Sequence, residues 1–321
     1  MEFRLSPEQE MVRESAAEFA AKELGPHVAE WDRTSSFPVD AFRKAGELGF
    51  LGVLVPEEYG GAGLGYVDYV SVVEEISKVD PAVGLGVAAH NSLGTGHILQ
   101  FGNEAQKTKY LPRLSRGEWV AAWGLTEPTA GSDAGGTRTT AVRDGDHWVL
   151  NGTKTFTTHA AVGQVAVIFA SSDPSKKHDG ISAYIVERTA PGFGVGKHED
   201  KLGMRASDTS EVILQNCRIP AANLIGREGE GFKQAMHVLD GGRISIAALA
   251  IGIAAGALHH AVRYARERQQ FGRPIGAFQA IQAKIADMAT EVDAARLLTL
   301  RAAWLKDQGR HTTRESSMAK L

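Results

Sequence analysis

The sequence predicts an α+β protein of three parts: an N-terminal all-helical domain, a central antiparallel β-barrel-like domain, and a C-terminal helical bundle that is incomplete. Three observations predict this order: helical periodicity in the first third of the chain, short β-branched and aromatic segments in the middle, and two long helical patterns without internal proline at the end. We expect domain boundaries at residues 1–117, 118–220 and 221–321.

The N-terminal domain opens with a helix-start signal at Ser6-Pro7-Glu8-Gln9. This is a capping-box pattern with proline at the first helical position, and the amphipathic run that follows reaches about Asp32. The same periodicity recurs between turns over residues 41–48, 67–78, 83–100 and 104–114. The first domain is therefore expected to be all-helical.

The central domain is predicted from short segments with strand character. They cover residues 119–125, 139–143, 148–151, 164–170, 183–187 and 211–215. Asp144-Gly145 separates two of them as a tight hairpin signal, and no long helical segment intervenes. This pattern favours an antiparallel meander or barrel.

The C-terminal part holds the longest helical patterns. Residues 231–268 predict one helix despite Gly241-Gly242, and residues 274–307 predict a second, so the two should pack as a hairpin in a bundle. A third helix begins near Thr312, and its pattern is still helical at Leu321. We therefore expect the natural chain to continue with the helices that close the bundle.

Composition and charge exclude several classes of function. With 321 residues, 43% of them apolar and 23% charged, the chain can fold as a globular protein with real cores. Its net charge of −3 offers no basic field for a phosphate backbone, so no nucleic-acid partner is expected. No apolar run approaches the ~20 residues of a membrane span, and no signal-peptide pattern is present, so we expect a cytoplasmic protein without a membrane partner.

Three other features carry no predicted chemistry. The single cysteine, Cys217, excludes an intrachain disulfide and is expected to be a small apolar residue at a strand end. Residues 60–65 do not space their glycines as a dinucleotide-binding fingerprint, so a nicotinamide fold is rejected. His259 and His260 would point in different directions on a helix, so no metal site is predicted.

The densest chemical signal is the segment 124–136, which reads Gly-Leu-Thr-Glu-Pro-Thr-Ala-Gly-Ser-Asp-Ala-Gly-Gly and leaves a predicted strand. Small residues and backbone N–H groups in such a loop let a planar or phosphorylated ligand approach the main chain closely. The segment resembles, position by position, the signature of the acyl-CoA dehydrogenase family: small, aliphatic, Ser/Thr, Glu, two variable residues, small, Gly, Ser/Thr, Asp.

The resemblance covers the whole chain. Further matching motifs are Pro56-Glu57-Glu58-Tyr59-Gly60-Gly61, Asn151-Gly152-Thr153-Lys154, Lys201-Leu202-Gly203-Met204-Arg205, Asn216-Cys217-Arg218-Ile219-Pro220 and Arg268-Gln269-Gln270-Phe271-Gly272. The order of helices, β-domain and helices is also similar to that family. By its general sequence pattern the chain is most similar to the short-chain, butyryl-type branch of this family.

The resemblance implies FAD as the cofactor. The residues that it implies along the flavin are Trp123, Gly124, Leu125, Thr126, Gly131 and Ser132 in the first segment, and Phe156, Thr157 and Thr158 in the second. Phe156 stands where the family commonly has tryptophan, and without its neighbours it would be read as an ordinary core aromatic. The resemblance further implies that Arg268 and Gln279 reach the FAD pyrophosphate of a neighbouring subunit, with Phe271 against the adenine half.

The resemblance also implies an acyl-CoA site. Its residues are Ser132, facing the CoA arm, and the segment Asp240-Gly241-Gly242-Arg243 on the long helix. Arg243 would bind the nucleotide end, because a guanidinium offers a charged donor fork to phosphate or ribose oxygens. The alternative is a solvated helix arginine paired with Asp240. Likewise, Arg263, Arg266 and Arg273 around Arg268 are expected to be surface residues.

The implied reaction is α,β-dehydrogenation of an acyl-CoA thioester to the trans-2-enoyl-CoA, with electrons passed to an electron-transfer flavoprotein by a homotetramer of fatty-acid β-oxidation. In most of the family the base is a glutamate in a Tyr-Glu-Gly segment beyond the position of Leu321, and a minority carry it where this chain has Gly242. We therefore assign no catalytic residue and expect residues 1–321 alone to dehydrogenate little. Two alternatives stay open: an acyl-CoA oxidase or flavin monooxygenase on the same scaffold, and a non-catalytic FAD or acyl-CoA binding module.

Overall fold

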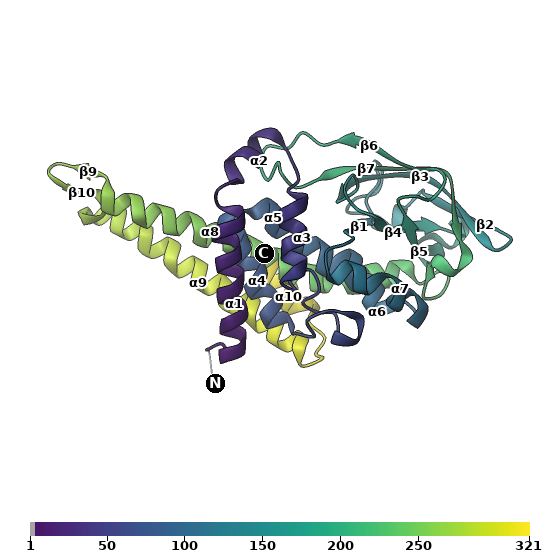
Figure 1. Cartoon of the computed structure of the whole chain (residues 1–321), viewed down its shortest axis with the longest axis horizontal. Coiled ribbons are helices and arrows are strands. Elements are labelled where there is room, and N and C mark those ends of the chain that lie inside the picture. Colours follow the sequence, from purple (N-terminus) through teal and green to yellow (C-terminus); the bar gives the residue numbers. More distant parts are fainter. Residues whose placement is uncertain (1–3) are drawn as a thin grey trace. The chain divides into compact units, whose positions relative to one another are not determined.

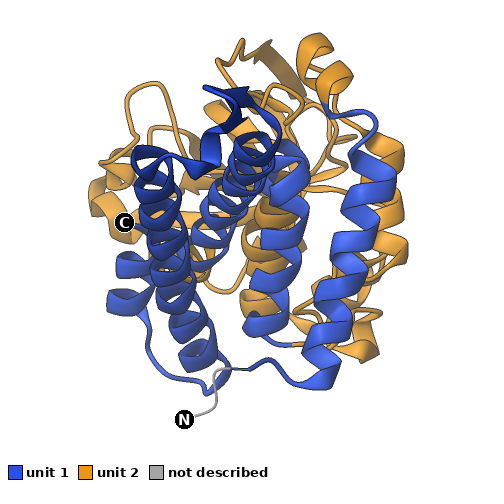
Figure 2. Ribbon diagram, turned by 90° about the vertical axis from the view of Figure 1, so that its left-hand side faces the viewer, with its two compact units in different colours: residues 1–28, 65–85, 243–321 blue, residues 29–64, 86–242 orange. Residues whose placement is uncertain are grey.

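The computed structural model describes residues 4–321, and its elements are labelled in Figure 1. The chain forms two compact units, each assembled from separate stretches of sequence. Unit 1 contains residues 1–28, 65–85 and 243–321, and unit 2 contains residues 29–64 and 86–242 (Figure 2). The predicted order of helices, sheet and helices is confirmed. The units divide the N-terminal helices between them, and the three predicted domain boundaries stay predictions.

Unit 1 is helical. It contains α1 (Pro7–Phe19), a π-helical turn (Ala20–Leu24), α4 (Tyr66–Val79), the start of α5 (Pro81–Ala89), most of α8 (Gly231–Glu267), α9 (Gln279–Asp307) and α10 (Thr313–Lys320). The capping box is confirmed, since the Gln9 N–H donates to Ser6 Oγ at 3.2 Å and the Ser6 N–H donates to Gln9 Oε1 at 2.9 Å. The predicted continuous helix to Asp32 is wrong: it is interrupted at Gly25-Pro26, where proline supplies no N–H.

Two glycines let α8 lie directly against α4. A Cβ at Gly252 would stand 2.5 Å from the Glu74 carbonyl oxygen, and one at Gly256 would stand 2.4 Å from that of Lys78. From α9, Arg296 donates to Glu74 at 2.8 Å. Asp307, at the end of α9, accepts from the first N–H groups of α4, those of Tyr66 at 2.6 Å and Val67 at 3.1 Å. The long helices therefore depend on α4 for both packing and polar contacts.

Unit 2 combines short helices with the sheet. The helical elements are α2 (Val28–Thr34), α3 (Val39–Glu47), the end of α5, a π-helical turn (His90–Thr95), α6 (Gly96–Phe101) and α7 (Glu104–Ser115). The strands are β1 (Ala121–Gly124), β2 (Thr140–Asp144), β3 (His147–Thr158), β4 (Val165–Ser171), β5 (Ile181–Glu187), β6 (Phe193–His198), β7 (Thr209–Pro220) and β8 (Leu224–Ile225). All six predicted strand segments are strands, whereas β6, with two glycines in six residues, and the two-residue β8 gave no sequence signal.

The strand order is β6-β7-β3-β2-β4-β5-β8, with β1 paired to β4 beside this path. The predicted hairpin is confirmed: Asp144 pairs with His147 across a two-residue turn in which Gly145 has φ 59°. Most strand pairs are antiparallel, as expected, but the sheet is open and mixed, so the expected barrel-like closure needs correction. β1 runs parallel to β4, because it enters from α7 and leaves through the signature loop instead of through a hairpin.

β4 is buried on both faces of the sheet. Val165, Val167 and Phe169 pack into a core shared with α6 and α7, while Ala166 and Ile168 pack into a second core with Trp148 and Leu150 of β3. A run of apolar residues without alternation is what a strand covered on both sides requires. This double burial fixes β4, and with it the position of β1.

On the edge of β1 that faces away from β4, histidine side chains form hydrogen bonds with the backbone of the strand. The Ala121 N–H donates to His90 Nδ1 at 3.2 Å, and the Ala121 carbonyl accepts from His159 Nδ1 at 3.1 Å. His90 in turn meets the Leu114 carbonyl through Nε2 at 3.1 Å. His90 therefore has one fixed tautomer, with the proton on Nε2 and the acceptor on Nδ1, which is the neutral form, whereas His159 makes its one hydrogen bond through Nδ1. Burial lowers the pKa of His90 to about 3, and burial also lowers the pKa of His159.

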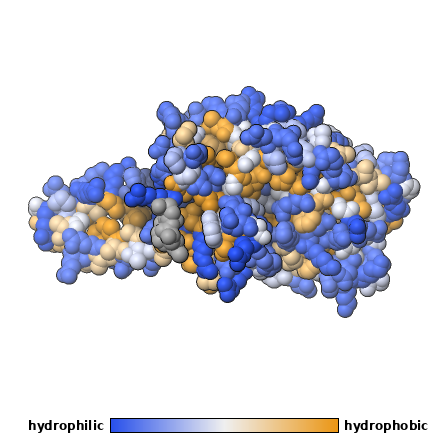
Figure 3. All heavy atoms as spheres, turned by 90° about the horizontal axis from the view of Figure 1, so that it is seen from below, coloured by the Kyte–Doolittle hydropathy of each residue, from blue (hydrophilic) through white to orange (hydrophobic). Residues whose placement is uncertain are grey.

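Some apolar side chains reach the surface (Figure 3), among them Leu202, Phe271 and Met11. Within the described residues one helix, α8, is long and apolar enough to cross a membrane by length and composition alone. Core helices of globular proteins meet the same criterion, and α8 carries buried core residues such as Ala235, Ile244 and Ala248.

We predict that the protein loses stability in acid below the ordinary histidine pKa. The folded pKa of a buried neutral histidine lies below its unfolded value of about 6.5, so the unfolded chain binds more protons and stability falls as pH falls through that value. Each such histidine contributes up to about 1.4 kcal/mol per pH unit in this window. Urea denaturation at pH 7, 6 and 5 measures the slope. In His90→Gln this slope should correspond to about one proton fewer taken up on unfolding. An unchanged slope would contradict the prediction.

Candidate active site

A cavity of about 180 Å³ lies in unit 2 where the π-helical turn, β1 and the end of β3 meet. Its lining residues are Ala89, Leu93, Ala121, Trp123, Leu125, Thr126, Thr155, Phe156 and Thr158. Five predicted flavin residues are in this lining: Trp123, Leu125 and Thr126 from the first segment, and Phe156 and Thr158 from the second. Two sequence segments about 30 residues apart therefore form one wall, and the Thr155 N–H joins them by donating to the Thr126 carbonyl at 2.9 Å.

A buried ion pair fixes the two segments against each other. Lys154 Nζ lies 2.6 Å from Glu127 Oε1, and the two side chains are 0% and 4% exposed. Lys154 also donates to the Leu125 carbonyl at 3.2 Å. The Glu127 carboxylate further accepts from Thr139 Oγ1 at 2.6 Å, from the Thr139 N–H at 3.0 Å and from the Arg138 N–H at 2.7 Å. The glutamate of the signature segment is thus a structural anchor, with its oxygens already in use.

The electrostatics of the pair follow from its burial. Burial acts to raise the pKa of Glu127, but the Lys154 ammonium and the hydrogen bonds from Thr139 and Arg138 outweigh it, so this pKa lies below its ordinary value. Burial lowers the pKa of Lys154 to about 8, against the opposing effect of Glu127. The lowered pKa of Glu127 favours its carboxylate form, and the short contact with it favours the ammonium form of Lys154, so the two groups act as an ion pair.

Phe156 projects from a break in the β3 ladder. The register shifts between Lys154 and Thr157, the φ angle of Phe156 is 54°, and the residue is 65% exposed. A left-handed backbone at a residue with a side chain costs on the order of 1–2 kcal/mol. The alternative of an ordinary core aromatic is excluded by this exposure, and the strained backbone instead turns the ring to the cavity lining.

The residues present fit a flavin ring. Trp123, Leu125 and Phe156 offer apolar surface for a planar system, whereas Thr126 and Thr158 offer hydroxyl groups for its polar edge. The buried hydroxyl of Thr155, also in the lining, and that of Thr157 have no hydrogen-bond partner within the described residues. Unpaired polar groups beside an apolar cavity are the donor set that a ring with carbonyl and nitrogen edges needs.

The remaining residues of the first flavin segment lie around this cavity without lining it. Gly124 lies in β1, where a Cβ would stand 2.8 Å from Ile168 Cδ1 and 3.1 Å from Lys154 Cγ, so only glycine lets the ion pair fit beneath the strand. Gly131 and Ser132 are exposed in the signature loop. Their predicted contacts with FAD and the CoA arm stay predictions.

The predicted substrate segment approaches the cavity at one point. A Cβ added to Gly242 would lie 3.3 Å from Cδ2 of Leu93, a lining residue. Asp240 and Gly241 precede it on α8, and Arg243 is the next residue, assigned to unit 1. The absent side chain at Gly242 thus leaves Leu93 its present position at the cavity wall.

The third predicted set belongs to unit 1. Arg268 ends the α8 side of a short hairpin (β9, Gln269–Gln270; β10, Arg273–Pro274), and Gln279 begins α9. Phe271, at the tip, has φ 54° and is 92% exposed, with its ring 6.0 Å from that of Phe278. These residues lie together at the tip, and none of them lines the cavity in unit 2.

Sequence reasoning missed several residues of the site. Ala89, Leu93, Ala121 and Thr155 line the cavity but gave no signal, because small and aliphatic residues on helices and strands look like core. Glu127 and Lys154 were visible inside the quoted motifs without an assigned role. The available signal was a charged residue between apolar or small neighbours, which indicates a buried charge that needs a partner.

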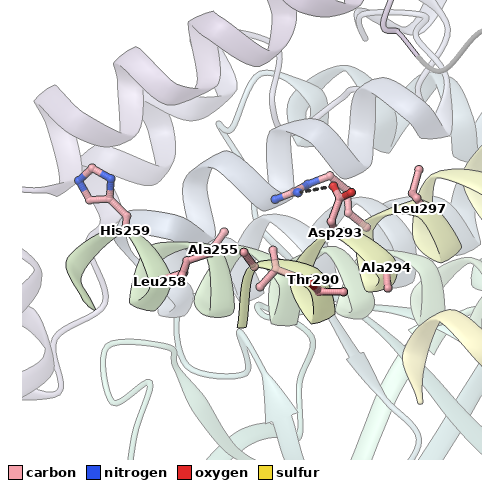
Figure 4. Close-up of a pocket in the computed structure, with 10 residues that line it drawn as sticks. Ala255, Leu258, His259, Thr290, Asp293, Ala294 and Leu297 are labelled. Carbon is pink, nitrogen blue, oxygen red and sulfur yellow. Dashed lines mark hydrogen bonds and ion pairs between the residues drawn. The ribbon is translucent and has the colours of Figure 1, made fainter. Parts of the chain in front are cut away.

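Three other features of the described residues bear on the chemistry. A groove of about 740 Å³ between α8 and α9 is lined mainly by apolar residues, with Arg296 and Asp293 paired at 3.5 Å along it (Figure 4). Cys217 is buried, and burial raises the pKa of its thiol to about 11, which agrees with a structural role. Among residues 4–321 no group of histidine, cysteine and carboxylate side chains could hold a metal ion.

The fold and the cavity define a protein with a cavity between a strand, the loop that follows it and a bulged strand, whose lining fits a planar cofactor. Comparison with known families gives the class. Residues 6–118 match the acyl-CoA dehydrogenase N-terminal domain, residues 122–217 the middle domain, and residues 229–321 the C-terminal domain.

Individual proteins agree with the family matches. The chain is 49% identical to the probable acyl-CoA dehydrogenase YngJ of Bacillus subtilis, over 100% of this chain and 85% of that protein. Its structure resembles butyryl-CoA dehydrogenase from Megasphaera elsdenii, with TM-score 0.97, 42% identity, and coverage of 99% and 84%. It also resembles a chain in a structure described as the electron transferring flavoprotein of Acidaminococcus fermentans, with TM-score 0.98, 49% identity, and the same coverage of 99% and 84%. The chain therefore belongs to the acyl-CoA dehydrogenase family of flavin-dependent oxidoreductases.

We predict that Lys154 and Glu127 are energetically coupled. Lys154→Met and Glu127→Gln each leave one buried group without its partner, so each should lower the free energy of unfolding by about 3–5 kcal/mol. The double variant should lose clearly less than the sum of the two losses. Urea denaturation of the four proteins measures this cycle.

The matched control is the exposed pair of Arg116 and Glu118, 2.7 Å apart with side chains 53% and 49% exposed. Glu118→Gln should change the free energy of unfolding by less than about 1 kcal/mol. Strictly additive losses at Lys154 and Glu127 would show that the pair does not join the two segments.

Proposed function

We propose that this protein oxidises a short-chain acyl-CoA to the trans-2-enoyl-CoA in the unit 2 cavity and passes the electrons to an electron-transfer flavoprotein. The observation that carries the proposal is the meeting of both flavin segments in one cavity, with Gly242 of the substrate segment against its wall. FAD, the cofactor of this family, supplies a flavin nitrogen that accepts the β-hydrogen as hydride.

The chain's own contribution is to hold and orient the reacting groups. Phe156 and Trp123 give apolar surfaces to the ring, and the hydroxyls of Thr126 and Thr158 orient its polar edge. The apolar lining also excludes water, which strengthens any hydrogen bond that forms to the thioester carbonyl as negative charge develops on it. These roles require correct positioning of the groups and exclusion of water. They require no proton transfer by the lining residues.

The lining contains no titratable side chain at all. Abstraction of the α-proton needs a carboxylate within hydrogen-bond reach of the substrate. The only acidic residue of the signature near the wall, Glu127, is ionised and fully hydrogen-bonded to Lys154, Thr139 and Arg138. We therefore assign the base to none of these residues, and Gly242 is no base either.

The substrate class rests on the relatives. The butyryl-CoA dehydrogenase of Megasphaera elsdenii shares the fold along almost the whole chain. This similarity supports a short acyl chain. Butyryl-CoA is therefore the first substrate to test.

We also propose a cytoplasmic homotetramer in which the hairpin tip of one copy meets the FAD of another. Phe271 supports such a contact. Its ring is exposed and its backbone is in a conformation unusual for a residue with a side chain, and burial of an exposed aromatic ring against another copy is favourable. Arg268 and Gln279 at the same tip offer polar groups for the pyrophosphate.

The first test uses the protein made from its whole coding sequence. Purified with FAD and mixed anaerobically with butyryl-CoA, it should lose its visible flavin band, and the product should be crotonyl-CoA. Failure of every acyl-CoA to bleach bound FAD would favour a non-catalytic binding module. Peroxide formed in air at the rate of turnover would indicate an oxidase.

The second test addresses the substrate segment. Gly242→Leu should press on Leu93 and raise KM for butyryl-CoA by about tenfold, roughly 1.4 kcal/mol. Gly203→Leu is the matched control, because a Cβ at Gly203 meets nothing within 4 Å. Equal kinetics in all three proteins would place the acyl-CoA elsewhere.

A further inference from the structure

His97 lies on α6 and is fully buried in unit 2, with 0% of its surface exposed. Its ring contacts Phe101 at 5.3 Å and Phe169 of β4 at 5.4 Å between centroids. Two polar contacts accompany this packing: Nε2 lies 3.0 Å from Gln234 Oε1 on α8, and Nδ1 lies 3.4 Å from the indole nitrogen of Trp123 on β1. The imidazole thus connects three elements, one of which reaches the cavity.

The hydrogen-bond directions are fixed by Gln234 and Trp123. The Gln234 amide nitrogen donates to the Ile225 carbonyl at 3.2 Å, which leaves its Oε1 as the acceptor facing His97. His97 Nε2 therefore carries the proton and donates. Nδ1 then has a lone pair, which accepts from the indole N–H of Trp123, a group that can only donate.

The neutral ring is the stable form at this position. Burial lowers the pKa of His97 to about 4, against the opposing effect of the contact with Gln234. In the neutral ring one nitrogen donates and the other accepts, as the two neighbours require. Protonation would place an N–H against the indole N–H and abolish the acceptor.

The Trp123 ring is held from two sides. Its edge meets Phe169 with centroids 4.9 Å apart, and its N–H is taken up by His97. Trp123 also lines the cavity, together with Phe156. Without the acceptor, the indole N–H would be left unpaired in an apolar core, which favours rotation of the ring out of its present orientation.

We propose that His97 is a positioning residue for the flavin reaction: as the neutral Nε2–H tautomer it holds the Trp123 indole in the orientation that shapes the cavity wall. The proposal rests on the proposed function, since it places the isoalloxazine in this cavity. His97 touches neither the cavity nor a substrate, and it acts only through Trp123.

Three variants at one position separate the acceptor from the packing. His97→Asn places an amide oxygen near the former Nδ1 and keeps an acceptor for the indole, whereas His97→Gln reaches the former Nε2 and keeps only the contact with Gln234. His97→Phe keeps a ring and removes both hydrogen bonds. Trp123→Phe identifies the indole resonance by its loss and removes the donor.

The first readout is hydrogen exchange of the Trp123 indole N–H in the apoprotein, followed by nuclear magnetic resonance. Exchange should be on the order of tenfold faster in His97→Gln and His97→Phe than in the wild type, and close to the wild type in His97→Asn. The second readout is the FAD dissociation constant and the visible flavin spectrum. His97→Gln and His97→Phe should weaken FAD binding severalfold and shift the spectrum, and neither should have an effect when Trp123 is already phenylalanine.

The outcomes distinguish the two proposals. If all three His97 variants behave alike, or if His97→Phe still matters in the Trp123→Phe background, His97 is only a packing residue and the inference is wrong. If indole exchange responds as expected while FAD binding and spectrum do not, Trp123 does not face the flavin and the inference is wrong in that step. If the wild type binds no FAD, the proposed function fails, whatever the exchange data show.

Discussion

The buried ion pair of Lys154 and Glu127 is the interaction on which the site depends. It joins a loop that follows β1 to a strand that is not its sheet neighbour, and it lies under the wall that both segments build. Desolvating two charges is costly. The compensation comes from the short contact, from the hydrogen bonds that Thr139 and Arg138 donate to Glu127, and from the one that Lys154 donates to the Leu125 carbonyl. Gly124 belongs to the same arrangement, because a side chain there would displace the lysine.

The ion pair can act in this way because β1 is itself held on both edges. One edge pairs with β4, whose own position is fixed by apolar cores on both faces. Within residues 4–321 no strand pairs with the other edge, and the N–H and carbonyl of Ala121 are satisfied by His90 and His159. Imidazole rings can replace a strand here since each offers one donor and one acceptor in a fixed plane. The site thus rests on an edge strand completed by side chains.

The sequence predicted the elements better than it predicted their connections. Helical and strand segments follow from periodicity, and the capping box at Ser6 and the turn at Asp144-Gly145 were found because their signals are local. The break at Gly25-Pro26 was missed since the amphipathic pattern continues across it. The parallel pairing of β1 was invisible because it depends on a partner 44 residues away, Val165 for Ala121, and no local residue type encodes it.

The same distinction between local and distant determinants governs the candidate site. Several residues recognised by motif, such as Thr126 and Phe156, line the cavity, and Glu127 and Lys154 of the same motifs hold the two segments together. Further supporting residues come from elsewhere in the chain. His97 supports Trp123 from α6, and Gln234 fixes the tautomer of His97 from α8. A histidine on an apolar helix face is equally compatible with a plain core position, so only the three-dimensional contacts separate the two interpretations. In this fold part of the cavity lining can be read from motifs, and its support combines a buried ion pair inside the motifs with buried polar side chains outside them, such as those of His97 and Gln234.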